Sequence, residues 1–298
     1  MTNSPPVHTS FVNRIPLKLR DYYLLTKPEV NLLILMTTSA GYYLGLRGSF
    51  HFLGLFHTLV GTLLVASGTA TLNQWRERTW DGQMRRTANR PLPSGRIGSL
   101  EAFLFGLFLS VAGGLYLAVL VNTLSSLLAV STLLSYLLVY TPLKRRTPLC
   151  TLLGAFTGAM PTLIGWAGAS GAITPQAMFL FAVLFLWQFP HFLAIALMYR
   201  DDYARAGYRM LPRFDLESRF TRGEILAFTL ALIGTTVASV IVSAGPVYWG
   251  SMVLAGGFLL YHAARLAASG SKVLAGRLLH ASVVYLPVVL AILALSKH

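Results

Sequence analysis

Residues 73–96, NQWRERTWDGQMRRTANRPLPSGR, directly follow a long apolar run and carry side chains that could do chemistry. Asn73, Glu77 and Asp81 recur at every fourth position, and Arg85 extends the row. On a helix this spacing places the side chains on one face, with about 6 Å of rise between neighbours. Stacked oxygen ligands of this kind suit Mg2+, which takes one or two carboxylates together with substrate phosphate oxygens. The row therefore predicts a site for a magnesium–diphosphate complex.

A simpler interpretation is that these charges form a solvated helix end and pair with one another one turn apart. It suits Arg76, Arg78 and Arg96, because cytoplasmic loops of membrane proteins are rich in such residues. It suits Asn73 poorly, since an amide at the edge of an apolar run costs free energy unless another group bonds to it. We therefore favour the functional interpretation for the row.

A second polar cluster follows another apolar run, in LWQFPHFLAIALMYRDDYARAGYRMLPRF, where Asp201 and Asp202 precede several basic residues. A third apolar run ends in Lys144 and Arg145. Arginine offers a bidentate fork for phosphate oxygens, and lysine offers a point charge. Two acidic clusters and a group of cations on one membrane face would suit the departure of a diphosphate from a lipid-soluble substrate.

The surrounding sequence predicts that membrane helices position these clusters. The chain is 55% hydrophobic and only 11% charged, with a mean hydropathy of +0.62, whereas soluble domains carry about 25% charged residues. One crossing needs about 20 mostly apolar residues. The charge-free intervals predict one helix in each of 30–46, 48–75 and 278–296, and two in each of 102–143, 147–199 and 225–264. The prediction is an all-α membrane protein: a cytoplasmic tail, residues 1–29, and a single domain of nine transmembrane helices, residues 30–298.

The distribution of charge predicts the orientation. With nine spans and a cytoplasmic N-terminus, every one of the 24 Lys and Arg residues except Arg47 and Lys297 lies inside, as do all 10 acidic residues. Membrane insertion alone produces this bias, so the net charge of +14 does not indicate nucleic-acid binding. We expect a multi-pass protein of the inner (cytoplasmic) membrane with its polar clusters at the cytoplasmic face. The lone Cys150 excludes an internal disulfide.

The first cluster matches a longer pattern, N-x-x-x-[DE]-x-x-x-D-x-x-M-x-R-T-x-x-R-P-L-x-x-G, between Asn73 and Gly95. In this pattern the chain resembles the UbiA superfamily of intramembrane prenyltransferases. WQFPHF at 187–192 and the D-D-Y-x-R-A-G-x-x-M-L-P run at 201–212 are similar to the haem-prenylating branch of that superfamily. The likeness covers residues 20–296.

The resemblance implies a helical bundle around a central cavity that is open to lipid and capped by cytoplasmic loops. It implies farnesyl diphosphate as the donor and protohaem IX (haem B) as the acceptor, so that haem is a substrate and Mg2+ is the cofactor. The products would be hydroxyethylfarnesyl haem and diphosphate, made in haem biosynthesis for terminal oxidases. A downstream haem A synthase or oxidase assembly factors would be the candidate protein partners.

The resemblance also assigns roles to residues of the two acidic clusters. Asn73, Glu77 and Asp81 would hold one Mg2+, and Asp202, together with Asp201, would hold a second. Glu77 stands where the superfamily usually has aspartate, and it still supplies a carboxylate. The resemblance gives the grip on the diphosphate to four basic residues: Arg86, Arg90, Lys144 and Arg145.

The second cluster departs from the superfamily pattern. When the motif is aligned on Gly207, the paired aspartates of the superfamily fall on Tyr199 and Tyr203, with Asp201 and Asp202 between them. Three arrangements are open: a metal site rotated around the helix, a site with one carboxylate, or a metal held mainly by water and phosphate.

His191 completes the predicted catalytic set, together with Asn73, Glu77, Asp81 and Asp202. It lies in an uncharged run, about two and a half helical turns before Asp202. One interpretation is a histidine hydrogen-bonded within the bundle. The other is a buried imidazole that ligates haem iron or steers the added water.

Two other functions compete with haem prenylation. A quinone-type aromatic prenyltransferase would share the metal site but not the WQFPHF and D-D-Y signatures. A secondary transporter would also place polar residues among helices and show repeats. It should need a path to both membrane faces, whereas the acidic residues here are all predicted on one side.

Overall fold

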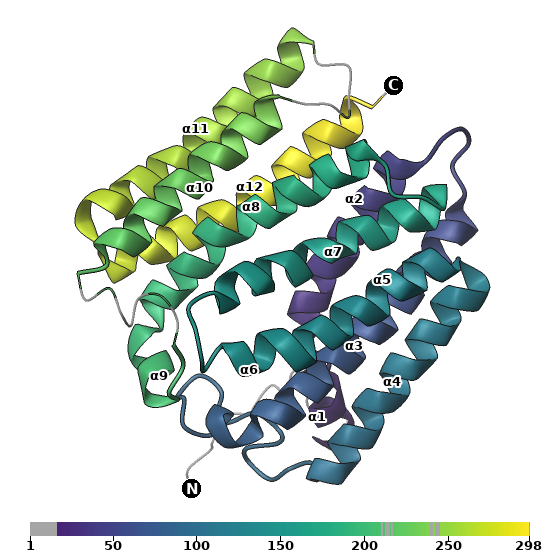
Figure 1. Ribbon diagram of the computed structural model, residues 1–298, viewed down its shortest axis with the longest axis vertical. Coiled ribbons are helices and arrows are strands. Elements are labelled where there is room, and N and C mark those ends of the chain that lie inside the picture. Colours follow the sequence, from purple (N-terminus) through teal and green to yellow (C-terminus); the bar gives the residue numbers. More distant parts are fainter. Residues whose placement is uncertain are drawn as a thin grey trace, which may run out of the picture.

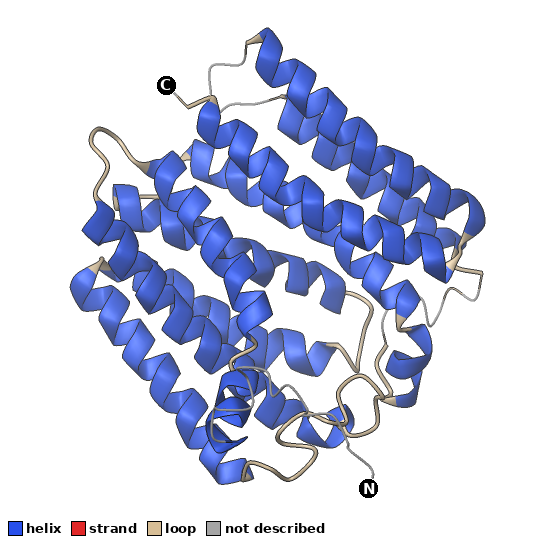
Figure 2. Ribbon diagram, turned by 180° about the vertical axis from the view of Figure 1, so that it is seen from behind, coloured by secondary structure: helices blue, strands red, loops and turns tan. Residues whose placement is uncertain are grey.

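The computed structural model describes residues 17–209, 211, 215, 217–238, 241 and 245–297. Every regular element in these residues is a helix (Figure 2), which confirms the predicted all-α class. The helices are, in chain order, α1 (Leu17–Leu25), α2 (Pro28–Gly45), α3 (Phe52–Asp81), α4 (Ser99–Leu120), α5 (Thr123–Leu134), the π-helical turn η2 (Ser135–Tyr140), α6 (Thr141–Leu143), α7 (Cys150–Ser170), α8 (Pro175–Met198), α9 (Arg200–Arg205), α10 (Arg219–Val237), α11 (Pro246–Ser269) and α12 (Lys272–Leu295).

Eight segments of the described chain are long and apolar enough to cross a membrane. They are α3, α4, the continuous segment Thr123–Leu143, α7, α8, α10, α11 and α12. The remaining predicted span, 30–46, coincides with α2, whose 18 residues include Glu29, Asn31 and several Thr, Ser, Gly and Tyr residues. Because α2 is only 18 residues long, these polar residues fall within any window that could span a membrane, so length and composition support eight spans among the described residues.

The helices form two neighbouring groups (Figure 1). Helices α8, α10, α11 and α12 lie side by side in one group, and α2 to α7 form the other. Helix α7 packs against both α2 and α8 and so joins the groups. The α2–α7 contact is close, because a Cβ at Gly41 would lie 2.2 Å from the carbonyl oxygen of Thr162. Small residues allow this backbone approach between membrane helices.

Apolar side chains fill both groups and also cover their outer surface. The larger buried cluster joins α7 and α8 to α10, α11 and α12, and a smaller one joins α3, α4 and α5. Many other large apolar side chains face outward, such as Val119 and Leu254, which are 79% and 77% exposed. An exposed apolar surface of this kind is typical of contact with a membrane.

The segment Thr123–Leu143 changes its winding before it ends. In η2 the backbone N–H of Thr141 bonds to the carbonyl oxygen of Tyr136, five residues earlier. A π-helical turn of this kind is frequent at functional sites. Because it adds a residue to one turn, it rotates Thr141 and the following Lys144 relative to the apolar part of the helix.

Helix α1 and residues 82–98 pack around the end of α3. The Gln74 side chain of α3 donates to the carbonyl oxygen of Leu25 at 2.8 Å. Arg96 donates from Nε to both carboxylate oxygens of the buried Asp21, at 3.0 and 3.1 Å. The part of the predicted tail that forms α1 is therefore a docked helix, and it covers the polar end of α3.

Candidate active site

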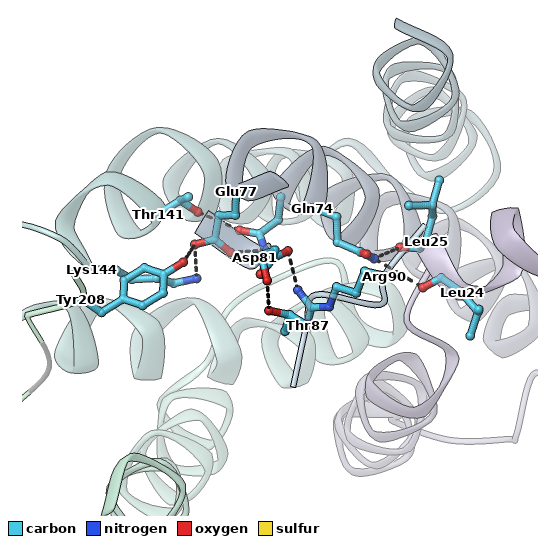
Figure 3. A network of polar contacts seen from close by, with 11 residues as sticks. Leu24, Leu25, Gln74, Glu77, Asp81, Thr87, Arg90, Thr141, Lys144 and Tyr208 are labelled. Atoms are coloured by element: carbon cyan, nitrogen blue, oxygen red, sulfur yellow. Dashed lines mark hydrogen bonds and ion pairs between the residues drawn. The ribbon is translucent and has the colours of Figure 1, made fainter. Parts of the chain in front are cut away.

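The predicted row at the end of α3 forms one buried, hydrogen-bonded unit (Figure 3). Asn73, Glu77 and Asp81 are only 1%, 4% and 1% exposed. Asn73 donates from Nδ2 to Oε2 of Glu77 at 2.9 Å, and its own Oδ1 accepts from Thr141 Oγ1 at 3.0 Å. The helical spacing read from the sequence thus places an amide and two carboxylates in one interior location.

Two groups from distant parts of the chain reach Glu77 (Figure 3). Lys144 donates from Nζ to Oε1 of Glu77 at 2.9 Å, and Tyr208 donates its hydroxyl to the same oxygen at 3.1 Å. The Lys144 ammonium also lies over the ring of Tyr140, 4.6 Å from its centroid. Desolvation acts to lower the pKa of Lys144, but the Glu77 carboxylate outweighs it and holds that pKa well above the ordinary value.

Tyr208 was not predicted from the sequence, although it lies in the second motif. Burial, together with the neighbouring Glu77 carboxylate, raises the pKa of the Tyr208 phenol. The phenol therefore keeps its proton and acts as a hydrogen-bond donor. Tyr208 also packs with Ala206 and Tyr203 against Met84, so the second motif closes over the loop that follows α3.

Asp81 ends α3 in a buried ion pair. Arg90 donates from Nη1 to Oδ2 of Asp81 at 2.7 Å, and Thr87 Oγ1 donates to the Asp81 carbonyl oxygen at the same distance. Both partners lie in the loop that curls back over the helix end. Removing one member of a buried pair leaves an uncompensated charge, which typically costs about 3–5 kcal/mol. The cluster thus holds two carboxylates, each matched by one cation.

Lys27 is a further cation that the sequence analysis did not assign to the site. It precedes Pro28 in the TKPEV segment and has a left-handed backbone, with φ of 52°, which is unusual for a residue other than glycine. Burial and the Arg90 guanidinium lower the pKa of Lys27 to about 7, against the opposing effect of Glu77 and Asp81. Lys27 interacts electrostatically with the four charged groups of the two ion pairs, Glu77, Asp81, Arg90 and Lys144. It therefore belongs to this cluster.

Arg86 and Arg145 lie on aromatic rings beside the cluster. The guanidinium carbon of Arg86 is 5.2 Å from the ring centroid of Tyr199, and that of Arg145 is 4.6 Å from the ring centroid of Trp80. Stacking of this kind leaves the guanidinium N–H edge available for phosphate oxygens. Arg145 also borders a pocket of about 330 Å³, whose lining residues are Arg76, Trp80, Thr141, Pro142, Arg145 and Arg146.

Asp201 and Asp202 form their ion pairs away from Glu77 and Asp81. Asp201 pairs with Lys272 of α12 at 2.8 Å, and both side chains are largely exposed. Asp202 pairs with Arg205 on the same short helix, α9, and its side chain is only 15% exposed. Among the residues that the structure describes, no group of three or more His, Cys, Asp and Glu side chains is arranged to hold a metal.

His191 belongs to α8 and contacts α12 through neutral groups. Its Nδ1 is 2.9 Å from Oγ of Ser282, and its ring stacks on Trp187 with centroids 4.6 Å apart. Trp187 in turn donates from Nε1 to the carbonyl oxygen of Ser282 at 2.8 Å. His191 lies within the bundle and is partly accessible.

This geometry defines a class of protein: a helical membrane protein with a buried cluster of paired carboxylates and cations at the end of one of its helices. The model of the UbiA prenyltransferase family matches residues 34–293, and the chain belongs to this family. The family predicted from the sequence is confirmed.

Relatives with the name protoheme IX farnesyltransferase match nearly the whole chain. The protein of Solibacter usitatus (strain Ellin6076) is 46% identical over 289 residues, covering 94% of this chain and 99% of the relative. That of Koribacter versatilis (strain Ellin345) is 41% identical over 290 residues, covering 94% of each. Both names agree with the predicted haem-prenylating branch.

Solved structures of UbiA homologues share the fold. The homologue from Aeropyrum pernix K1 has a TM-score of 0.70 at 22% identity and covers 88% of this chain and 96% of its own. The homologue from Archaeoglobus fulgidus bound to DMAPP and Mg2+ has a TM-score of 0.71 at 14% identity and covers 92% and 99%. The likeness confirms a UbiA-like helical fold.

Proposed function

We propose that this chain transfers the farnesyl group of farnesyl diphosphate to a vinyl group of protohaem IX, giving hydroxyethylfarnesyl haem and diphosphate. The shared name of relatives at 46% and 41% identity supports the two substrates. The observation that carries the proposal is the buried cluster at the end of α3, where Glu77 pairs with Lys144 and Asp81 pairs with Arg90.

The cluster fits Mg2+ bound jointly with a diphosphate. Asn73, Glu77 and Asp81 supply hard oxygen atoms on successive turns, too few for a complete cage. Such a set suits Mg2+, which completes its coordination with phosphate oxygens and water. The A. fulgidus homologue bound to DMAPP and Mg2+ supports this proposal. When bound, Mg2+ would neutralise charge that grows on the departing diphosphate.

The two ion pairs prepare the cations for the substrate. Lys144 and Arg90 are held by carboxylates at 2.9 and 2.7 Å, which keeps the buried cluster electrically balanced. With Mg2+ held by Glu77 and Asp81, Lys144 and Arg90 would be available to bind phosphate oxygens. Arg86 and Arg145 would add two guanidinium groups that can donate paired hydrogen bonds to phosphate oxygens. Together these fixed donors would stabilise the diphosphate leaving group as the allylic C–O bond breaks.

A second Mg2+ would depend on Asp202 more than on Asp201. The Asp202 side chain is 15% exposed, whereas that of Asp201 is 70% exposed and directed to Lys272. Of the two, Asp202 therefore has the surroundings of a ligand that completes a site when the substrate is present.

The reaction at the haem acceptor needs a region from which water is excluded until the new carbon–carbon bond has formed. The farnesyl carbon becomes cation-like as the C–O bond breaks, and the terminal carbon of the haem vinyl group attacks it. Water then adds to the vinyl carbon nearer the ring and loses a proton. We assign His191 to this half of the reaction, because it combines a titratable ring with aromatic and apolar neighbours.

The same proposal includes the placement in the membrane. Helix α2 would be a ninth span, since it is 18 residues long and its backbone is in direct contact with α7. With nine spans, the positive-inside rule puts the cluster at the cytoplasmic face of the inner membrane, below a central cavity.

Single cysteines test the orientation. In a Cys150→Ser background, Ala172→Cys should react with a membrane-impermeant thiol reagent from outside intact cells, and Ser94→Cys should not. Both positions are exposed, so accessibility to the reagent depends on the side of the membrane. The opposite labelling pattern would place the cluster on the outer face and contradict the proposal.

The activity itself is tested with purified protein, protohaem, farnesyl diphosphate and Mg2+, and mass spectrometry of the products. We expect a hydroxyethylfarnesyl adduct that forms with Mg2+ and does not form with EDTA. A parallel reaction offers hydroxybenzoate as the acceptor. Prenylated hydroxybenzoate in the absence of any haem adduct would move the assignment to the quinone-type branch.

A further inference from the structure

The hydroxyl of Ser282 connects His191 of α8 to the backbone of α12. Ser282 is completely buried, and its Oγ lies 2.9 Å from His191 Nδ1 and 2.7 Å from the carbonyl oxygen of Leu279. A serine hydroxyl has one proton to donate and can accept bonds through its lone pairs. The carbonyl of Leu279 can only accept.

These two contacts determine where the imidazole carries its proton. The Ser282 hydroxyl donates to the Leu279 carbonyl, a bond that buried serines commonly make within a helix. The contact with His191 then requires a proton on Nδ1, donated to Ser282 Oγ. In a neutral imidazole the other nitrogen, Nε2, is left with a free lone pair.

Trp187 restricts the ring further. Its indole stacks on the imidazole with an interplanar angle of 25°, and its Nε1 donates to the Ser282 carbonyl oxygen at 2.8 Å. Ser282 therefore occupies one edge of the imidazole, and Trp187, which bonds to the same serine, occupies one face. His191 remains partly accessible, and its Nε2 is not among the fully buried, unpartnered atoms of the described residues, so this edge of the ring can meet a ligand.

We propose that Ser282 is a positioning residue that fixes His191 in the Nδ1–H tautomer and presents the Nε2 lone pair to the iron of the haem acceptor. The proposal rests on the proposed function, since it takes haem as the ligand. Histidines that bind metals usually donate their other ring N–H to a neighbouring acceptor, which fixes both tautomer and orientation. Ser282 occupies that place here.

The tautomer can be read without substrate. The full chain is prepared in lipid nanodiscs with nitrogen-15 in its histidine rings, and His191→Gln identifies the His191 signals by NMR. We expect a proton on Nδ1 and none on Nε2 in the wild type and in Ser282→Thr, which keeps the hydroxyl. Ser282→Ala should yield a mixture of tautomers. A wild-type ring with its proton on Nε2 would overturn the proposal.

The link to haem is tested with the same variants and protohaem alone. Loss of an outer partner of a metal-bound histidine typically costs 10–100-fold in affinity or activity. Ser282→Ala should therefore weaken haem binding roughly 10-fold or more and shift the haem absorption spectrum toward that of His191→Ala. Ser282→Thr should restore both. Trp187→Phe, which keeps a stacking ring, should have a smaller effect.

A matched control separates positioning from packing. Ser125 is also completely buried, and its hydroxyl bonds to the backbone of α7, far from His191 in the sequence. Ser125→Ala should leave the haem spectrum unchanged. If Ser282→Ala changes the tautomer but not the haem spectrum or turnover, His191 does not use its lone pair on iron and the proposal fails. If the wild type forms no haem adduct at all, the proposed function fails, whereas the tautomer measurement still stands.

Discussion

The end of α3 and the contact between α8 and α12 hold their functional side chains in opposite ways. At the end of α3, Glu77 and Asp81 are fixed by full charges, and the partners come from several separate segments. At the α8–α12 contact, His191 is fixed by one neutral hydrogen bond and a stacked ring. We therefore propose the first region for the charge that leaves with the diphosphate, and the second for the planar, largely apolar ring system of the haem acceptor.

This difference predicts that mutations in the two regions will affect the two substrates separately. Buried charges interact strongly in a low-dielectric interior, so removing one charge disturbs the whole cluster. A neutral histidine bonded to one serine can be changed with less effect on its surroundings. Variants in the two regions should therefore fail at different steps of one reaction.

The largest expected effect follows from Asp81→Asn. The change keeps the shape but removes a charge that Arg90 and the proposed Mg2+ both need, so we expect turnover to be abolished. A suitable control is Asp21→Asn, because Asp21 is also a buried aspartate paired with an arginine, Arg96, outside the cluster. Asp21→Asn should lower thermal stability but leave turnover within a few-fold. Asp81→Asn activity within about tenfold of wild type, or ~1.4 kcal/mol of barrier, would contradict the metal-ligand role.

His191→Ala should give the next largest effect, and only on the acceptor side. Haem prenylation should fall by about 100-fold or more, whereas Mg2+-dependent binding of farnesyl diphosphate should persist because the cluster is intact. His280→Ala serves as the control, since His280 is exposed and bonds to the carbonyl of Gly276 on its own helix. Loss of both substrates in His191→Ala would indicate a structural histidine.

Lys27 should couple donor binding to pH. In the free protein its pKa is lowered to about 7, so the ammonium is lost as pH rises through 7 and its attraction for the diphosphate weakens. We expect KM for farnesyl diphosphate to rise between pH 6 and 8 in the wild type. Lys27→Arg, which stays charged, should remove this component, and Lys27→Met should raise KM by about tenfold. An identical pH profile in wild type and Lys27→Arg would exclude Lys27 from the site.

The same shift has a consequence for stability. The folded chain gives up the Lys27 proton near pH 7, whereas the unfolded chain keeps it up to the ordinary value of 10.5. The unfolded state therefore binds more protons in this window, and the Lys27 contribution to stability increases as pH rises from about 7 to 10.5.

The smallest expected effect is that of Asp201→Asn. Its exposed pair with Lys272 should contribute little to stability, because solvent screens the two charges, and we expect turnover to stay within about twofold of wild type. Asp202→Asn, at the next position, should lower turnover by about tenfold or more if it completes a second Mg2+ site. Equal, large losses in both variants would show that the second motif works as a pair of ligands.

The sequence predicted the parts of the molecule that depend on local pattern. Charge-free runs gave the all-α class and the eight apolar helices, and the four-residue spacing gave the shared face of Asn73, Glu77 and Asp81. The charge-free runs could not distinguish α2 from the eight more clearly apolar spans, because α2 has the length of a span but contains several polar residues. The predicted roles of the site residues remain predictions.

Contacts between segments that are distant in the sequence could not be predicted from residue spacing. Tyr208 reaches Glu77 across 131 residues, and Lys27 joins the same charges from the start of α2. Neither residue lies at a spacing that marks it in the sequence. The sequence also could not predict that the Asp201 side chain is directed to Lys272, because α8 ends at Met198 and the separate helix α9 does not continue the face of α8.

The π-helical turn η2 gives this chain a sensitivity to length that substitutions do not reveal. Each residue advances an α-helix by about 100°, and η2 sits between the apolar part of its helix and the residues Thr141 and Lys144 that contact Asn73 and Glu77. Deleting one residue within 135–140 would leave hydropathy and composition almost unchanged, yet it would turn Lys144 away from its carboxylate. In an alignment of relatives, such a deletion would look like an ordinary one-residue gap, although it removes the ion pair between Lys144 and Glu77. Insertions and deletions within η2 therefore matter for the site as much as substitutions of its charged residues.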